Sequence, residues 1–247
     1  MLFYIKLFFK KHGRVVMMWA CILIAAISFS VPFLQSAAIS KLQSTEIDRI
    51  QNLTAEELKQ NAQEANVTFD YSQVQSISPA AIAEAALNRV QSYALGMIAV
   101  PDLDMLLPIY KGVENTTLFY GAGTLKEDQQ MGKNNYVLAS HNYEYEPNLL
   151  FTPLLRSTVG MKVYLTDKEK VYVYRISEIS KVKPEDVWVV DDRGRDELTL
   201  ITCDDINGNY RMIYRCDLVE IKTVEEMGSD MSIFNKTISN IDAQGTL

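Results

Sequence analysis

A long uncharged segment near the N-terminus constrains this chain more than any other feature. Residues 15–40 carry no formal charge, and residues 15–34 read VVMMWACILIAAISFSVPFL. About 20 apolar residues, at ~1.5 Å each in a helix, are enough to cross the ~30 Å hydrocarbon layer of a bilayer. The formal charge before this segment comes from Lys and Arg alone, which mark the cytoplasmic flank of a span. We therefore predict a single-pass anchor at residues 15–38, with the N-terminus in the cytoplasm and the body outside the cell membrane.

A cleaved signal peptide is the alternative interpretation of this segment. The small residues Ser36, Ala37 and Ala38 resemble a cleavage site. The apolar run, however, is longer than the ~7–15 residues of a signal peptide. The length favours an anchor that is retained, and Pro32 is expected to kink or end the helix near its outer end.

The composition of the rest of the chain excludes several classes of protein. The net charge is −7, with 24 basic and 31 acidic residues, and it argues against nucleic-acid binding, which needs clustered Lys and Arg. Three cysteines in 247 residues exclude a disulfide scaffold. Paired Cys or His ligands for zinc and a complete phosphate-binding glycine loop are absent from the sequence. We expect no cofactor and no nucleic-acid partner.

Residues 39–92 are predicted to form a helical spacer between the anchor and the main domain. Thr54 and Glu57 have the spacing of a capping box at a helix start. Ser78 and Pro79 indicate a second helix start, since proline is favoured at the first helical position.

After residue 95 the sequence changes to short β-rich runs separated by turn residues. Strands are predicted at residues 118–121, 135–140, 161–166, 170–176, 187–190, 197–202, 210–215 and 217–221. The segment TDKEK between two of them is a hairpin loop by composition. Strands at this frequency, with few long helices between them, favour a mainly β protein with an antiparallel barrel or sandwich. Residues 225–247 lose the pattern and are predicted to be a mobile tail.

One thiol and one imidazole are the groups of this body that could carry nucleophilic catalysis. His141 follows the predicted strand NYVLAS, and Cys203 follows the predicted strand ELTLIT. A cysteine with a nearby histidine is the minimum for a covalent acyl intermediate. Spacing along the chain does not show that the two meet in space, and a packed histidine with an inert cysteine is the alternative at this point. Cys216 is a second thiol, and a disulfide between Cys203 and Cys216 is open on sequence grounds.

The residues around Cys203 resemble a known family. Residues 199–203, TLITC, fit the TLxTC signature of sortases, and Arg211 follows the cysteine by eight residues, as in class A members. The segment YGAGTLKEDQQMGKNNYVLASHN is similar to the one that delivers the sortase histidine, and MKVYLTDKEKVYVYRI is similar to the central hairpin. The similarity spans roughly residues 95–222. The chain is identified as resembling a class A housekeeping sortase of the streptococcal and lactobacillar type.

This resemblance implies a fold, a reaction and a set of site residues. The fold is a mainly β, closed antiparallel eight-stranded sortase-type barrel with short helices. The implied reaction is cleavage of an LPxTG-type sorting signal between Thr and Gly through a thioester on Cys203, followed by transfer to a cell-wall precursor amine, lipid II. His141 would serve as acid and base, and Arg211 would hold the substrate or the oxyanion. The residues expected to contact substrate are Thr202, Ala139, Ile201, Val187 and Val189.

Further expectations follow from the same resemblance. The partners are secreted proteins that carry the LPxTG signal, the peptidoglycan precursor amine, and the membrane through the N-terminal helix. The predicted divisions are a basic tail at 1–14, the anchor at 15–38, the spacer at 39–92, the catalytic barrel at 93–224 and the tail at 225–247. Arg215 lies on the same face of its strand as Arg211 and is expected at the far end, in solvent. The loop before the histidine strand contains only Glu127 and Asp128 as acidic residues, so the sequence does not support calcium dependence and leaves it open.

Two other functions are compatible with the residues alone. A cysteine protease would hydrolyse the same acyl-enzyme with water in place of the amine. A non-catalytic surface module on an N-terminal anchor would not need the thiol at all.

Overall fold

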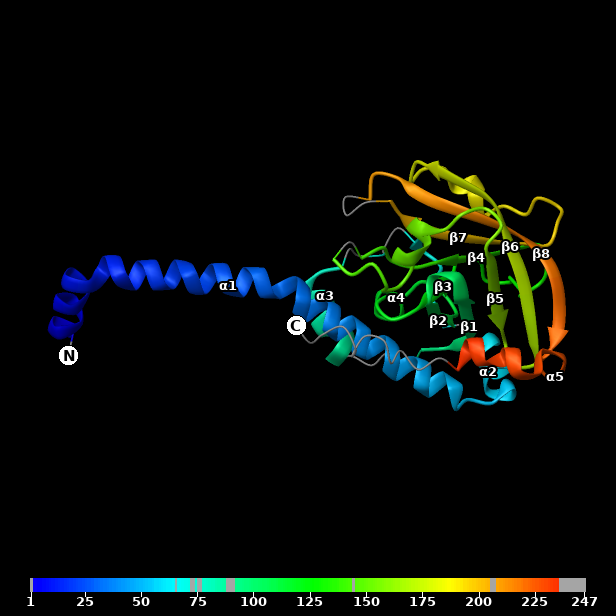
Figure 1. Cartoon of the computed structure of the whole chain (residues 1–247), viewed down its shortest axis with the longest axis horizontal. Helices are drawn as coiled ribbons and strands as arrows, with labels where there is room; N and C mark the ends of the chain where they lie inside the picture. The colour runs from blue at the N-terminus through cyan, green and yellow to red at the C-terminus, as the bar shows by residue number, and fades with distance from the viewer. Residues whose placement is uncertain are drawn as a thin grey trace.

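The computed structural model contains a closed barrel of eight strands, joined in the order β1-β2-β3-β4-β7-β8-β6-β5 (Figure 1). It describes residues 2–64, 66–71, 74, 77–87, 92–143, 145–204 and 208–235. The strands are β1 (Ala94–Val100), β2 (Met105–Tyr110), β3 (Ala122–Thr124), β4 (Asn135–Ala139), β5 (Lys162–Thr166), β6 (Lys170–Val182), β7 (Glu197–Cys203) and β8 (Arg211–Thr223). The α-helices are α1 (Leu2–Gln51), α2 (Ala55–Ala62), α3 (Pro79–Leu87), α4 (Asn115–Leu118) and α5 (Val224–Met227). The 3-10 helices are η2 (Pro101–Leu103), η3 (Thr152–Arg156), η4 (Val187–Val190) and η5 (Gly228–Phe234).

The predicted closed eight-stranded barrel is confirmed, and two of its strand pairs are parallel. β2 pairs with β3 and β4 pairs with β7 in parallel, while the other neighbours in the described barrel are antiparallel. The barrel interior is filled by alternate residues of its strands, as the period of two requires. Fully buried examples are Leu107, Leu138, Leu165, Tyr174, Leu198 and Leu200.

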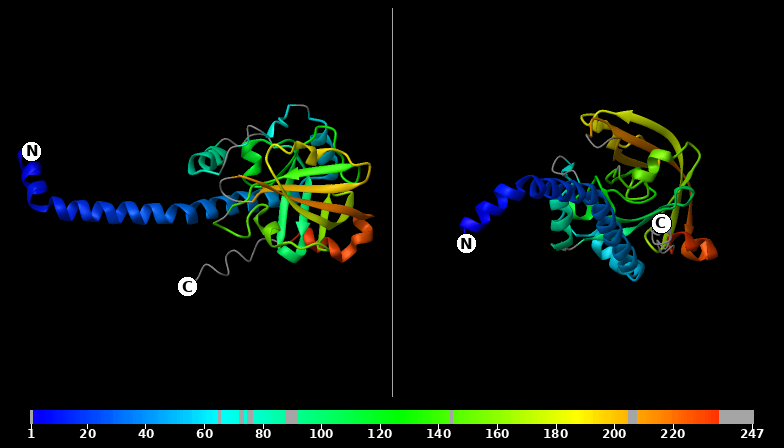
Figure 2. Two further views of the ribbon diagram at one scale, coloured as in Figure 1. Left: turned by 90° about the horizontal axis from the view of Figure 1, so that it is seen from above. Right: turned by 60° about the vertical axis from the view of Figure 1, so that its left-hand side comes forward.

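Helix α1 runs without a break from the apolar segment to the barrel. Its N-terminal half projects away from the domain, and its C-terminal half lies along the barrel in all views (Figures 1 and 2). In the described part of the chain this is the helix that is long and apolar enough to cross a membrane, and its apolar window is not buried inside the structure. Pro32 lies inside the helix and does not end it.

The predicted helix starts after α1 are confirmed. Thr54 caps α2, its side chain accepting from the backbone N–H of Glu57 while Glu57 accepts from the backbone of Thr54. Helix α3 begins at Pro79, and the Ser78 hydroxyl accepts from the backbone N–H of Ala81.

Several predicted strands were misplaced. Residues 118–121 lie in α4 and the turn after it, and residues 187–190 form η4, because short apolar runs do not distinguish a strand from a buried helical turn. The predicted strands 210–215 and 217–221 are one strand, β8. β1 and β2, which read as nearly unbroken apolar runs, were not singled out. The hairpin loop between β5 and β6 is confirmed.

The C-terminal region is more regular than its composition indicates. The capping box of Thr223 and Glu226 starts α5, and η5 follows it. Met227 and Phe234 are buried against the barrel, and the Phe234 carbonyl accepts from the side-chain amide of Gln51 at 2.9 Å. Residues 236–247 of the predicted tail lie outside the described residues.

Candidate active site

Three neighbouring strands place His141, Cys203 and Arg211 at one end of the barrel. β7 lies between β4 and β8, and Cys203 at its end is directly opposite Arg211 at the start of β8. On the other side, Ala139 pairs with Ile201 in parallel, so His141 reaches the level of Cys203. Strands in a sheet lie ~4.8 Å apart, which brings the three residues together although they are 70 positions apart in sequence.

Hydrogen bonds beyond the end of β4 fix this alignment. The backbone N–H of Ser140 donates to the Ile201 carbonyl at 3.2 Å, and the Thr202 hydroxyl donates to the Ser140 carbonyl at 2.9 Å. One residue further, the side-chain amide of Asn142 donates to the Cys203 carbonyl at 3.2 Å. The two strand ends are therefore tied on both sides of His141.

The His141 ring lies in an apolar setting. It stacks on Phe119, with ring centroids 5.5 Å apart and an interplanar angle of 22°. The residue is half-buried, but its Nε2 atom is out of contact with solvent and has no hydrogen-bond partner among the described residues. Burial lowers the pKa of His141 to about 4, so the ring is neutral near pH 7 and able to accept a proton.

Arg211 is held by the loop that precedes it. Its Nη1 donates to the Gly208 carbonyl at 2.8 Å and to the Tyr210 carbonyl at 3.3 Å. Gly208 has a φ of +65° and lies so close to the site that a methyl group added there would be 3.8 Å from Cys203 Sγ. The backbone of this loop therefore fixes the guanidinium beside the thiol.

A small apolar cluster adjoins the three residues on the outside of the barrel. Residues of β4, β7 and β8 that share the face of His141 and Cys203 form it together with η4. This buried cluster, which we call the groove floor because we expect substrate to bind there, consists of Val137, Ala139, Val189, Ile201 and Ile213, each at most 6% exposed.

Three of the five predicted substrate contacts belong to the groove floor, namely Ala139, Ile201 and Val189. Val187 does not, because its side chain is 72% exposed at the start of η4. Thr202 is fully buried on the opposite face of β7, where its hydroxyl joins the two strands.

Tyr71, from the segment before α3, covers the groove floor and was not singled out from the sequence. Its ring packs against the floor and lies 5.8 Å from the Arg211 guanidinium carbon. Burial and the nearby Cys203 thiol raise the pKa of Tyr71 to about 12, against the opposing effect of Arg211. The segment is attached to the barrel through the Thr68 carbonyl, which accepts from Val113 at 2.8 Å. Phe69 and Tyr71 are both aromatic residues of the polar spacer, and nothing in the sequence indicates that the Tyr71 ring packs on the groove floor.

Arg215 lies at the other end of the same face and is not in solvent, contrary to the prediction. It is 2% exposed and forms an ion pair with the fully buried Glu197 at 3.4 Å. It also donates to the carbonyl of Val189, in η4, at 3.3 Å. Burial acts to raise the pKa of Glu197, but Arg193, Arg215 and Arg195 together hold it below its usual value. The network holds η4 in place, so that Val189 packs with the other residues of the groove floor.

A disulfide between Cys203 and Cys216 is excluded by the register. Both thiols are free. Cys216 pairs with Leu198, five residues from Cys203 along β7, or about 16 Å at ~3.3 Å per residue. A disulfide needs Cα atoms within about 7 Å. Cys216 is fully buried, which raises the pKa of its thiol.

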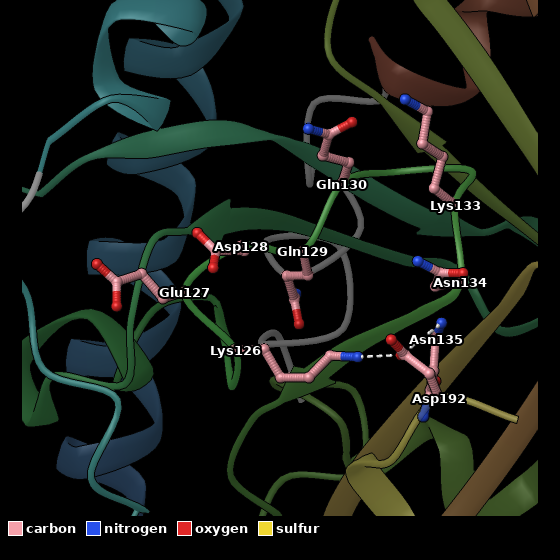
Figure 3. Close-up of a pocket in the computed structure, with 9 residues that line it drawn as sticks. All are labelled: Lys126, Glu127, Asp128, Gln129, Gln130, Lys133, Asn134, Asn135 and Asp192. Atoms are coloured by element: carbon pink, nitrogen blue, oxygen red, sulfur yellow. Dashed lines mark hydrogen bonds and ion pairs between the residues drawn. The ribbon is translucent and has the colours of Figure 1, made fainter.

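The loop between β3 and β4 carries acidic residues that could bind a cation, but a lysine of the same loop, Lys126, lies among them. A cavity of about 470 Å³ lies here, and Lys126 points across it to Asp192, with Nζ and Oδ1 2.5 Å apart (Figure 3). Glu127 and Asp128 are directed away from Asp192 (Figure 3). Within the described residues, no group of three His, Cys, Asp or Glu side chains could hold a metal ion. The Lys126 ammonium supplies the positive charge that ties the two loops.

Comparisons with known proteins show the family to which the chain belongs. Residues 98–219 match the family model described as the sortase domain. The chain is 42% identical to Sortase A of Streptococcus agalactiae over 225 residues, which are 88% of this chain and 89% of that protein. It is 36% identical to Sortase A of Listeria monocytogenes over 70% of this chain and 76% of that protein. The crystal structure of Listeria monocytogenes sortase A superposes with a TM-score of 0.55 and 34% identity, covering 58% of this chain and 98% of that chain.

The two arginines of β8 should separate into one that affects activity and one that affects stability. Arg215→Ala leaves polar partners unsatisfied in a buried network, and we expect it to cost about 2–4 kcal/mol of unfolding free energy. Arg211→Ala should cost less than about 1 kcal/mol, as for a partly exposed side chain. Thermal unfolding of the detergent-solubilised chain measures both. A stable Arg215→Ala protein that forms no acyl-enzyme would assign the site arginine to Arg215.

The stability of the fold should depend on pH through His141. Its pKa of about 4 in the folded chain lies below the ~6.5 of an unfolded chain, so the unfolded chain binds the extra proton between these values. Stability from this residue is present above pH 6.5 and is lost as the pH falls towards 4. We expect the unfolding midpoint to drop over this interval less in His141→Gln than in the wild type. An equal drop in both would contradict the burial of the ring.

Removal of the Tyr71 ring should favour peptide binding. A substrate that lies on the groove floor must displace this partly buried ring, at a cost of about 1 kcal/mol, so Tyr71→Ala should lower KM roughly five-fold. Tyr71→Phe keeps the ring and should leave KM near the wild-type value. Steady-state cleavage of an LPETG peptide measures both variants, and a raised KM in Tyr71→Ala would show that the ring helps to hold the peptide.

Proposed function

Because the chain belongs to the sortase family, as a class A member, we propose that Cys203, His141 and Arg211 are the residues that perform its transpeptidation. The chain is a sortase transpeptidase that anchors proteins to the cell wall. The observation that carries the assignment is the strand register, which sets Cys203 opposite Arg211 and beside the end of the His141 strand.

In the first step, Cys203 Sγ attacks the carbonyl carbon of Thr in an LPxTG-type signal. The neutral His141 ring takes the thiol proton, so a reactive thiolate forms as the new C–S bond does. A tetrahedral intermediate carries the negative charge on the former carbonyl oxygen. The C–N bond to Gly then breaks, and the His141 imidazolium gives its proton to the leaving amine.

In the second step, an amine of the cell-wall precursor attacks the thioester carbonyl. His141 takes the amine proton, the new amide bond forms, and the thiolate leaves and recovers its proton from His141. Burial lowers the pKa of His141, which makes its imidazolium a stronger acid toward the leaving amine and its neutral ring a weaker base toward the thiol and the incoming amine.

Arg211 stabilises the charge that develops between these states. A guanidinium stays protonated and cannot act as a base, but it offers several fixed N–H donors. The Gly208 and Tyr210 carbonyls hold it without neutralising it. It can therefore donate to the oxyanion or to a backbone carbonyl of the peptide.

The groove floor is the proposed seat of the apolar residues of the signal. Ala139, Ile201 and Val189 extend from the thiol along the outside of the barrel, where Leu and Pro of the signal would displace water and the Tyr71 ring. Thr202 is proposed to act indirectly, by holding the ends of β4 and β7 together.

The location of the protein follows from the N-terminal helix. We propose that residues 1–14 stay in the cytoplasm, that residues 15–38 span the membrane and that the barrel lies outside, where secreted substrates and lipid II are accessible. The reactivity of Cys203 with a membrane-impermeant thiol reagent on intact cells measures this orientation.

Acyl-enzyme trapping tests the proposed roles. The detergent-solubilised full chain is mixed with an LPETG-containing peptide and an excess of a glycine-based amine, and products are identified by mass spectrometry. We expect a transfer product and an acyl adduct on Cys203. Cys203→Ala should abolish both, and the matched variant Cys216→Ala should retain both, since that thiol is buried away from the site.

The other outcomes distinguish the alternatives. Cleavage without transfer to any amine would favour a protease that hydrolyses the acyl-enzyme. An adduct on Cys216 would overturn the choice of nucleophile. Full activity in His141→Gln would remove the histidine from the proposed proton transfers.

A further inference from the structure

The end of the barrel that carries the candidate site lies close to the apolar span of α1. The barrel contacts α1 from Ile39 onward, and this face of the helix is buried at Ile39, Gln43, Ile47 and Ile50. Ile39 is five positions after Leu34, the last residue of the apolar run, which is about 7.5 Å of helix. Such a short distance does not lift the domain away from the bilayer surface.

The barrel is also fixed in orientation on the helix. The Gln43 side-chain amide donates to the Leu106 carbonyl at 3.4 Å, and the Tyr110 hydroxyl donates to Glu46 at 3.0 Å. The ends of β4 and β7 and the start of β8 lie at the end of the barrel that faces the N-terminal half of α1 (Figures 1 and 2). No flexible linker lies between the apolar span and this arrangement, since α1 is continuous.

The loop after His141 touches the span itself. The Tyr143 hydroxyl lies 3.2 Å from the Pro32 carbonyl oxygen and 3.4 Å from Gln35 Oε1. Tyr143 is therefore at the level of the last turn of the apolar run. Tyr145 packs edge-on against the Tyr143 ring at 5.7 Å, but its own side chain is 55% exposed.

Nearby side chains of the helix are apolar and exposed at the same level. Phe33 is 64% exposed and Leu34 is 67% exposed, as expected for residues that face lipid. Tyrosine is favoured where the hydrocarbon layer meets the headgroups, because its ring is apolar and its hydroxyl is polar. Tyr145 presents an exposed ring of this kind at the depth where the span ends.

From these contacts we propose that the loop containing Tyr143 and Tyr145 docks on the outer leaflet of a phospholipid bilayer and holds the catalytic end of the barrel at headgroup level. Tyr143 is two residues after His141, which lies at the level of Cys203, and the residue between them, Asn142, donates to the Cys203 carbonyl. The thiol then faces a substrate that arrives in the membrane plane. This consequence for the acceptor rests on the proposed function, but the lipid contact does not.

Tryptophan quenching tests the lipid contact in the full chain. In a background of Trp19→Phe and Trp188→Phe, Tyr145→Trp places a single fluorophore in the loop. The matched control is Val219→Trp, because Val219 is 49% exposed on β8 and lies eight residues beyond Arg211, about 26 Å along the strand. In phosphatidylcholine vesicles with bromine near the headgroups, we expect strong quenching at position 145 and little at position 219. Equal quenching at the two positions would overturn the proposal.

A lifting insertion provides the second test. Seven helical residues inserted after Ser36 raise the barrel by about 10 Å with almost no rotation. We expect the quenching at position 145 to fall to the level of position 219. Unchanged quenching at position 145 would overturn the proposal, since the contact would not depend on the height of the barrel.

The same insertion separates the membrane contact from the chemistry. Transfer to a glycine-bearing lipid in the vesicle should decrease several-fold, while transfer to soluble triglycine should stay unchanged. Equal loss of both would show that the insertion damages the site, and unchanged transfer to the lipid would overturn the role of docking. Absence of both transfers in the parent chain would contradict the proposed function, and the quenching result would still decide the lipid contact.

Discussion

The arrangement of the candidate site depends on the pairing of β7 with its two neighbours. β4 and β8 run in opposite directions beside it, so the end of β4 and the start of β8 both meet the end of β7. The parallel neighbour, β4, places His141 beside Cys203, although the histidine precedes the thiol by more than 60 residues in sequence. The antiparallel neighbour, β8, places Arg211 opposite Cys203. A slip of one residue in either pairing would turn a side chain to the other face, away from the thiol. The backbone ladder therefore sets the positions of the three side chains.

The outer face of β7 and β8 has a different electrostatic environment at each of its two ends. Near the thiol, the half-buried His141 ring has a solvent-shielded Nε2 atom and burial keeps it neutral, whereas Arg211 is charged and held by carbonyl groups. At the far end, Arg215 and Glu197 form a buried pair that fastens η4. Buried charges must be paired, and here the pairing also closes one side of the apolar floor. Two arginines four residues apart thus have different tasks because their partners differ.

The fold class and the strands around the site could be predicted from the sequence, because motif and periodicity are local properties. The same motif gave the candidate site residues as a hypothesis. The sequence was not sufficient for β1 and β2, whose residues are buried on both sides and show no alternation. The environment of Arg215 also depended on a partner, Glu197, that the strand pattern does not reveal. Tyr71 is the clearest case, because a ring that reaches the groove floor from a distant polar segment leaves no trace in the order of residues.

The continuity of α1 changes what an anchor does in this protein. A flexible linker would let the domain sample many heights and orientations above the bilayer, and each productive encounter would then cost conformational entropy. Here one continuous helix forms the apolar span and then packs on the barrel through Ile39, Ile47 and Ile50. Orientation is therefore set during folding and not at each encounter. Under the proposed function, in which the acceptor is a membrane lipid, such a fixed height converts a search through volume into a search within a plane, and the reactive end must then face that plane.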